Sequence, residues 1–474
     1  ALLGMAEVLR KARRYEEMGL TSKDPVGAYR RLMTAASLTG QEAFAKLMSK
    51  EITRGMSGGE RQSFWEGFEN GLKGAVHKAR EDMPVEVAID LALAVMRETV
   101  SGDDSLGYRI AMSAATGDDH SIGYVIPEDG EYRIAAVDRA LWLIGGEALR
   151  RLERNDLRGA RQWLDWAHEE LDGGDRADPF QSSAFLDLWT RGAQGDMEQV
   201  RCAAASLLSF ESTMSQTLPI LTACRQTAVS EAPEGPRRAA LDRALLAAYL
   251  VLDRHEEAAE TAFRLAETST SEVLYRAQLR SLGNLRRWDD MRRIADARLA
   301  RTPDDVLAQM TLAEVAVRKG DFDEAERIYQ RFLGTGKANA DQYNTAAWIA
   351  LVRGRADERV LELAQRAASL SDYQDYGILH TLAAVYAEQG KAAEAYRIIL
   401  QALELKGEPD ADDLYVFGRL AEHYGLPEAA RHYYEKAGAQ STGDDNPMDT
   451  IHLVRKRLQA LGKPPEPKQV ATRR

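Results

Sequence analysis

The sequence predicts an all-α fold in which helical hairpins stack into an elongated array, with one small antiparallel β insert. Three observations predict it. The chain has 474 residues, whereas a single hydrophobic core stops growing at about 250–300 residues. In the second half, apolar residues recur at spacings of 33–35 residues, a period typical of stacked supersecondary units. Between residues 101 and 138 the helical pattern gives way to short alternating runs.

Composition and charge exclude several classes of protein. Hydrophobic residues make up 45% of the chain and charged residues 29%, with only 14 prolines, a balance typical of helical globular proteins. No stretch approaches the roughly 18 uncharged apolar residues that a membrane span needs. A net charge of −12 argues against a general nucleic-acid binder, which needs a basic surface. We therefore expect no nucleic-acid partner, no membrane span and no cofactor.

The two cysteines, Cys202 and Cys224, are too few for a zinc-ribbon ligand set or a disulfide framework. Both lie in apolar helical runs, where a free cysteine behaves as a small buried hydrophobe. We predict two buried thiols with no role in chemistry.

The repeat is clearest in the second helix of each predicted hairpin. One residue per unit, of small or moderate size, follows the last at 33, 34, 35, 35 and 35 residues: Ala258, Met291, Ala325, Val360, Ala395 and Ala430. Two antiparallel helices need small side chains where their axes approach. Glycines at the predicted turns, Gly320, Gly354, Gly390 and Gly425, suit a left-handed residue that ends the first helix.

Flanking residues complete the pattern. One unit contains Leu312, Ala313, Gly320, Phe322, Ala325, Tyr329 and Phe332, and a later one Leu382, Ala383, Tyr386, Gly390, Ala395, Ile399 and Ala402. This set resembles the tetratricopeptide repeat (TPR), which implies a right-handed solenoid of helical hairpins whose first helices line a concave groove. The chain departs from the family pattern at Arg286, where neighbouring units have Gly, and at the turn 354–357, which carries one extra residue.

These patterns divide the chain into five predicted segments. Residues 1–105 form a helical N-terminal region that resembles a Sel1-like or TPR unit near Asp24, Ala28 and Leu47. Residues 106–135 form the β insert, with strands near 108–112, 122–126 and 131–135. Irregular TPR-like helices follow over 136–236 and the regular array over 237–440. Residues 441–474 hold a capping helix at 448–461 and a basic tail, with seven Lys or Arg residues and one acid from Ile451 onward.

Three short motifs suggest an enzyme, and each lacks its structural context. The string G-x-S-x-G at 55–59 would make Ser57 a nucleophile only after a buried strand, but the preceding residues are polar, so we expect Ser57 to cap a helix. Residues 56–62 resemble the signature loop of ABC-transporter ATPases, yet the chain contains no P-loop string. The acidic run Asp118-Asp119-His120, with Asp103 and Asp104 nearby, could bind a metal, but adjacent side chains diverge. We predict no catalytic residue and no metal site.

The candidate site is instead the groove that the resemblance implies. It assigns groove-facing positions to the first helices of four units: Met310, Glu314, Arg318, Asn344, Trp348, His380, Tyr415 and Arg419. Several are i,i+4 pairs on one helix face, and Trp, Tyr, Met and Arg are enriched in binding hot spots. The alternative is that Trp348 only packs between helices.

The sequence therefore predicts a non-catalytic scaffold that binds a partner peptide or helix in this groove. Two alternatives remain: a hydrolase or other enzyme with a site in the first 140 residues, or a regulatory segment of a larger enzyme. Oligomeric state is open. We expect a cytoplasmic location, or a periplasmic or exported one if a signal peptide preceded Ala1.

Overall fold

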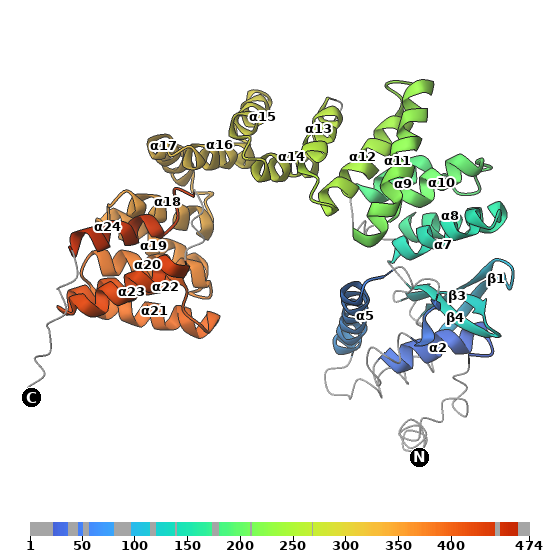
Figure 1. Ribbon diagram of the computed structural model, residues 1–474, viewed down its shortest axis with the longest axis horizontal. Coiled ribbons are helices and arrows are strands. Elements are labelled where there is room, and N and C mark those ends of the chain that lie inside the picture. Colours follow the sequence, from blue (N-terminus) through green and yellow to red (C-terminus); the bar gives the residue numbers. More distant parts are fainter. Residues whose placement is uncertain are drawn as a thin grey trace, which may run out of the picture. The chain divides into compact units, whose positions relative to one another are not determined.

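The computed structural model describes residues 22–36, 46–50, 56–79, 96–113, 120–137, 140–172, 180–208, 211–267, 269–440 and 446–462. The chain divides into two compact units, Ala1–Leu285 and Arg286–Arg474. Both consist mainly of helices, and the first also contains a small sheet (Figure 1). In the part of the chain that the structure describes, no helix has the length and apolar character needed to cross a lipid bilayer.

The first unit begins with helices and a sheet and continues as helical hairpins. The early elements are α2 (Pro25–Ala36), α5 (Gly58–Ala79), β1 (Arg97–Asp103), β2 (Gly107–Ser113), β3 (His120–Glu128) and β4 (Glu131–Val137). The later helices are α7 (Leu141–Glu153), α8 (Leu157–Asp172), α9 (Gln181–Leu188), α10 (Met197–Ser206), α11 (Glu211–Glu231), α12 (Pro236–Val251), α13 (His255–Ala266) and α14 (Glu272–Asn284). Helices α7 to α11 lie within residues 136–236, for which irregular helices were predicted.

The β insert is a four-stranded antiparallel sheet in the order β1-β2-β3-β4. The three predicted strands are confirmed as parts of β2, β3 and β4. Strand β1 was not predicted, because every residue in it is exposed and Val100 is its only large apolar side chain. Helix α2 packs on the sheet through Tyr29, whose hydroxyl shares a hydrogen bond of 2.5 Å with Ser121 Oγ. Its ring lies against Gly123, where an added Cβ would come within 2.3 Å.

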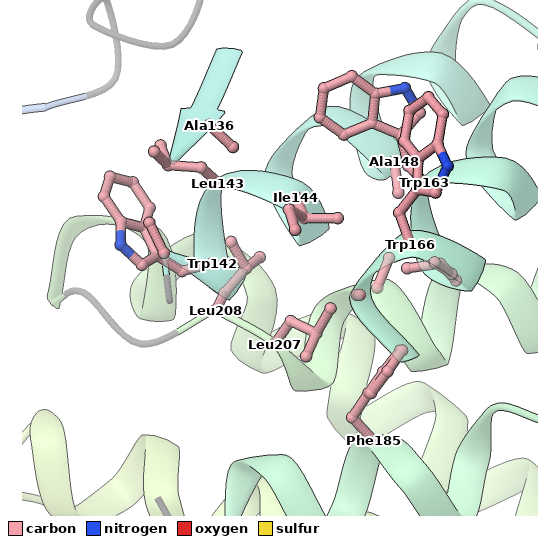
Figure 2. Close-up of a cluster of buried hydrophobic side chains, with 14 of the residues drawn as sticks. Ala136, Trp142, Leu143, Ile144, Ala148, Trp163, Trp166, Phe185, Leu207 and Leu208 are labelled. Atoms are coloured by element: carbon pink, nitrogen blue, oxygen red, sulfur yellow. The ribbon is translucent and has the colours of Figure 1, made fainter. Parts of the chain in front are cut away.

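A cluster of large side chains joins this sheet to the first helices (Figure 2). Trp163 of α8 is fully buried, and its Nε1 donates to the carbonyl of Leu106 at 2.7 Å. Its ring centroid lies 5.6 Å from that of Tyr124 on β3 and 5.7 Å from that of Trp166. The Arg151 guanidinium carbon stands 5.6 Å from the same indole. Sheet and helices thus share one core.

The prediction of two free thiols is wrong. Cys202 of α10 and Cys224 of α11 form a disulfide, with Cα atoms 5.9 Å apart. Both residues are buried, as predicted. Residue composition could not reveal the pairing, because two cysteines 22 residues apart approach only when the two helices fold against each other.

The second unit continues the helical hairpins. Its helices are α15 (Trp288–Arg301), α16 (Val306–Arg318), α17 (Phe322–Leu333), α18 (Ala340–Val352), α19 (Glu358–Leu370), α20 (Tyr376–Glu388), α21 (Ala392–Lys406), α22 (Ala411–His423), α23 (Pro427–Gln440) and α24 (Ile451–Ala460). All six residues that carry the repeat period are buried on second helices, as predicted. The four predicted turn glycines have positive φ, between 69° and 79°, and Arg286 adopts the same left-handed conformation at φ 54°.

Gly418 shows why the hairpins need a small residue in the first helix as well. The ring of Tyr434 on α23 lies directly against it, so that an added Cβ would stand 2.3 Å from Tyr434 Cε1. Tyr434 is fully buried and donates to Glu422 Oε1 at 2.6 Å. The ring therefore has no free space into which it could withdraw.

We expect Gly418→Ala to destabilise the second unit by about 1–3 kcal/mol, because overpacking forces side chains off their rotamers and shifts the backbone. Gly438→Ala on α23 is the matched control: its added Cβ would meet Ile451 Cδ1 at an ordinary 3.6 Å, and the alanine favours the helix by up to about 1 kcal/mol. Urea unfolding followed by circular dichroism would measure both. Equal stability of the two variants would contradict this account of the hairpin.

The C-terminal helix caps the array, as predicted, although α24 begins three residues later and ends one residue earlier than expected. It packs on α22 and α23, and it buries Ile451, Leu453 and Val454. Figure 1 shows it in dark red, across the hairpins of its unit.

Candidate partner-binding face

The candidate enzyme residues Ser57 and Asp103 make local structural hydrogen bonds. Ser57 Oγ accepts from Glu60 N at 3.2 Å while Glu60 Oε2 accepts from Ser57 N at 2.7 Å, which is the reciprocal arrangement of a capping box. The prediction that Ser57 caps a helix is confirmed. Asp103 accepts from Ser105 and Leu106 within a tight turn. Asp118 and Asp119 lie outside the described residues, and among those described no cluster of three or more His, Cys, Asp or Glu side chains could hold a metal ion.

The predicted groove residues lie on four first helices of the second unit. Met310, Glu314 and Arg318 belong to α16, Asn344 and Trp348 to α18, His380 to α20, and Tyr415 and Arg419 to α22. The structure does not bring all eight together. Arg318 stacks on Trp288 at 5.8 Å and lies 3.8 Å from Glu314, whereas Met310 packs, as Met448 does, against an apolar cluster of α16, α17 and α18. Together the first helices α16, α18, α20 and α22 form the candidate groove face.

Trp348 is the centre of this face and already has a partner. Its Nε1 donates to the carbonyl of Met448 at 2.9 Å. Its ring centroid lies 5.2 Å from that of His380 on the next first helix. His380 is only 4% exposed. Trp348 thus binds a segment that arrives from far along the chain and also packs against a neighbouring helix.

A network of charges lies at the other end of the face. The Tyr415 hydroxyl donates to Glu388 Oε1 at 2.6 Å, and Arg419 Nε donates to the same oxygen at 2.5 Å. Arg419 also bonds to Glu422 at 3.0 Å. Glu422 in turn accepts two hydrogen bonds from Arg457 of α24, one of them at 3.0 Å. Arg419 thus bridges two carboxylates from successive first helices, and one of them, Glu422, also pairs with Arg457 of α24.

The hydrogen bonds of this network stabilise the ionised forms of Glu422 and Arg457. Burial alone would raise the pKa of Glu422, but hydrogen bonds from Arg457 and Tyr434 hold that pKa below its usual value. The hydrogen bond that Arg457 donates to Glu422 raises the pKa of Arg457. At neutral pH both side chains are ionised, so α24 is held by an ion pair that is partly shielded from water.

Further carboxylates surround the start of α22. Asp412 accepts from Thr450 Oγ1, at the residue before α24. Tyr376 donates to Asp410 at 3.0 Å and to Asp413 at 3.2 Å, and Lys406 donates to Asp410 and to the Tyr376 hydroxyl. Burial opposes ionisation of Asp410, yet Lys406 and Tyr376 lower its pKa to about 2. Burial and the nearby charge of Asp410 raise the pKa of Asp413, so the negative charge at this end of the face lies mainly on Asp410.

Sequence reasoning missed Glu388, Glu422 and Asp412. The first two are separated by 34 residues, one repeat period, and both lie in the last turn of a first helix. An acidic residue that recurs at the period of the repeat was the available signal. The positions that the TPR resemblance assigns to the groove include Glu314 but none of these three acids.

Comparisons with known proteins give structural neighbours only. No family model matches the chain, and no curated protein matches it. Among solved structures, YrrB, described as a TPR protein with an unusual peptide-binding site, is 20% identical, with 42% of this chain and 99% of that chain covered and a TM-score of 0.31. A tetratricopeptide repeat protein from Parabacteroides merdae is 15% identical (69% and 100% covered, TM-score 0.26). Yeast Tom70 is 12% identical (68% and 82% covered, TM-score 0.29).

The class of fold rests on the chain's own helices. In each hairpin, the second helix buries a residue that recurs every 33–35 positions, and a residue with positive φ lies in the turn between the two helices. The chain is therefore a tetratricopeptide-like helical repeat protein with a small antiparallel sheet in its first unit. The predicted fold class is confirmed.

Proposed function

We propose that the chain is a protein-interaction scaffold and that the groove face of α16, α18, α20 and α22 binds a partner peptide or helix. One observation carries the proposal: side chains of the first helices α18 and α22 already hold the segment that contains α24, through a backbone carbonyl, an ion pair and a side-chain hydrogen bond, and α24 buries three apolar side chains. A face that recognises backbone, charge and apolar groups together has the properties of a helix-in-groove site.

A photo-crosslinking experiment would test this proposal. Benzoylphenylalanine would replace Glu314, a half-exposed predicted groove residue on α16. The control would carry it at Tyr396, which is 52% exposed on the second helix α21. We expect a discrete protein adduct from the Glu314 position in source cells and none from Tyr396. Adducts from Tyr396 alone would place the binding surface on the second helices instead.

We further propose that the chain works in an oxidising compartment. The sequence left a cytoplasmic location open beside a periplasmic or exported one. Buried structural disulfides persist where thiols are not kept reduced, and the Cys202–Cys224 bond joins two core helices. The disulfide therefore supports the second location.

A further inference from the structure

The segment from Asn446 to Gly462 does more than cap the last hairpin. A capping helix needs to cover only the apolar side of the final unit. Here Met448 reaches Trp348 on α18, two hairpins before the end, and Lys456 lies so close to the α18–α19 turn that a Cβ on Gly354 would stand 2.8 Å from its Nζ. Arg457 reaches Glu422 on α22. The segment therefore occupies the face proposed above for a partner.

Charge complementarity contributes to the binding of this segment. Among the described residues, Glu422 pairs with Arg457 and Asp412 accepts from Thr450, while Arg431 of α23 donates to the carbonyls of Leu461 and Gly462. The segment supplies Arg455, Lys456 and Arg457 and a single acid, Asp449. Opposite charges on two surfaces fix the register of the bound helix and disfavour acidic competitors.

The fit of the segment to the face is incomplete. Next to Trp348, the Oδ1 atom of Asn344 and the Nε2 atom of His380 are buried, and in the part of the chain that the structure describes neither has a hydrogen-bond partner. A buried polar atom without a partner is costly. A helix that placed polar side chains over these two atoms would bind the same face better than the chain's own segment does.

We propose that this face is a receptor for a basic amphipathic helix of another protein, and that the chain's own segment Asn446–Gly462 is an internal pseudo-ligand that the partner displaces. The recognition pattern is the one that the segment displays. It consists of two or three apolar residues on one face, as Ile451, Leu453 and Val454, followed by a cation at the position of Arg457, which pairs with Glu422. The inference rests on the proposed function and adds to it the class of partner and a built-in competitor.

A synthetic peptide with the sequence of residues 446–462 would test the proposal on the full chain. The tail-weakened protein is Val454→Asp/Arg457→Glu, which disrupts one buried contact and the ion pair with Glu422. The matched control protein carries Arg455→Glu/Gln459→Glu, which makes the same total change of charge at two exposed positions. We expect the fluorescent peptide to bind the tail-weakened protein at least tenfold more tightly than wild type, because it no longer competes with the tethered copy. Binding to the control should match wild type.

A second measurement keeps the test valid if the double variant folds poorly. On wild-type protein, saturating peptide should accelerate amide hydrogen exchange in the chain's own residues 446–462 and leave α19 and α21 unchanged. A peptide in which Arg455, Lys456 and Arg457 are all replaced with Glu should not. Unchanged exchange in the tail, or equal affinity for all three proteins, would overturn the proposal. A concentration-dependent dimer of wild type whose tails exchange between copies would also overturn it, since a second copy would then supply the helix.

These outcomes separate the two proposals. Crosslinks from Glu314 to a partner, combined with a tail that no peptide displaces, would leave the scaffold function in place and remove the pseudo-ligand. Displacement of the tail by the peptide, with no partner crosslinked, would keep the pseudo-ligand and remove the support for the scaffold function.

Discussion

Trp163→Ala is expected to destabilise the first unit by about 3–5 kcal/mol, the usual cost of truncating a fully buried aromatic residue. The indole fills the space between the sheet and α8, contacts Tyr124 and Trp166, and satisfies the Leu106 carbonyl at the β1–β2 turn. Alanine removes the packing and the hydrogen bond together. Since the sheet has no other indole bonded to that turn among the described residues, the loss should be greatest in β2 and β3.

Hydrogen exchange in the peptides that cover 107–128 would measure this local loss directly. Trp163→Phe is the intermediate variant, because it keeps one six-membered aromatic ring in the core but loses the N–H donor and the five-membered ring of the indole. We expect it to cost about 1–2 kcal/mol, the range for one buried acceptor left without its donor. If Trp163→Ala stays within about 1 kcal/mol of wild type on the same scale, Trp163 is not the residue that joins the sheet to the helices.

The second large effect is expected from the disulfide. Replacing Cys202 and Cys224 with alanine should lower the stability of the first unit by about 3 kcal/mol, the chain-entropy value for a closed loop of this length. The sequence separation of the two residues is 22, and both are buried. Urea unfolding of the double variant, beside wild type with and without a reducing agent, would measure the effect. Reduced wild type should behave like the variant.

Mass spectrometry provides an independent check on the same bond. Denatured wild-type protein treated with an alkylating agent should gain no label before reduction and two labels after it. Two labels without reduction would show that the cysteines are free thiols in the natural protein. That result would also remove the support for an oxidising compartment.

The repeat array could be predicted from the sequence because its determinants are local and periodic. Ala258, Ala325, Ala395 and Ala430 lie where two helices of one hairpin approach, and Gly320 and Gly390 end first helices with positive φ. Each requirement acts within about 35 residues. The same locality explains why Ser57 was correctly predicted as a cap from the residues around it.

The features that sequence reasoning missed depend on contacts between distant segments or carry no apolar signal. Strand β1 is held by backbone hydrogen bonds to β2 and buries none of its side chains. The Cys202–Cys224 bond requires the packing of α10 on α11. The occupation of the binding face by residue 448 requires a contact with residue 348, and no local pattern specifies it. The sequence suggested both a binding role and a packing role for Trp348, and in the structure it packs against His380 and binds Met448.

The contact between Trp348 and Met448 has a consequence for how the last three hairpins come apart. In an open stack of repeats each unit touches only its neighbours, so unfolding begins by fraying from an end. The hydrogen bond between Trp348 and Met448, which lie 100 residues apart, links the α18–α19 hairpin to the segment that contains α24. This segment therefore cannot detach without exposing the α18–α19 hairpin as well. During synthesis, Trp348 leaves the ribosome 100 residues before Met448. These three hairpins should therefore acquire their full cooperativity only after residue 448 has emerged.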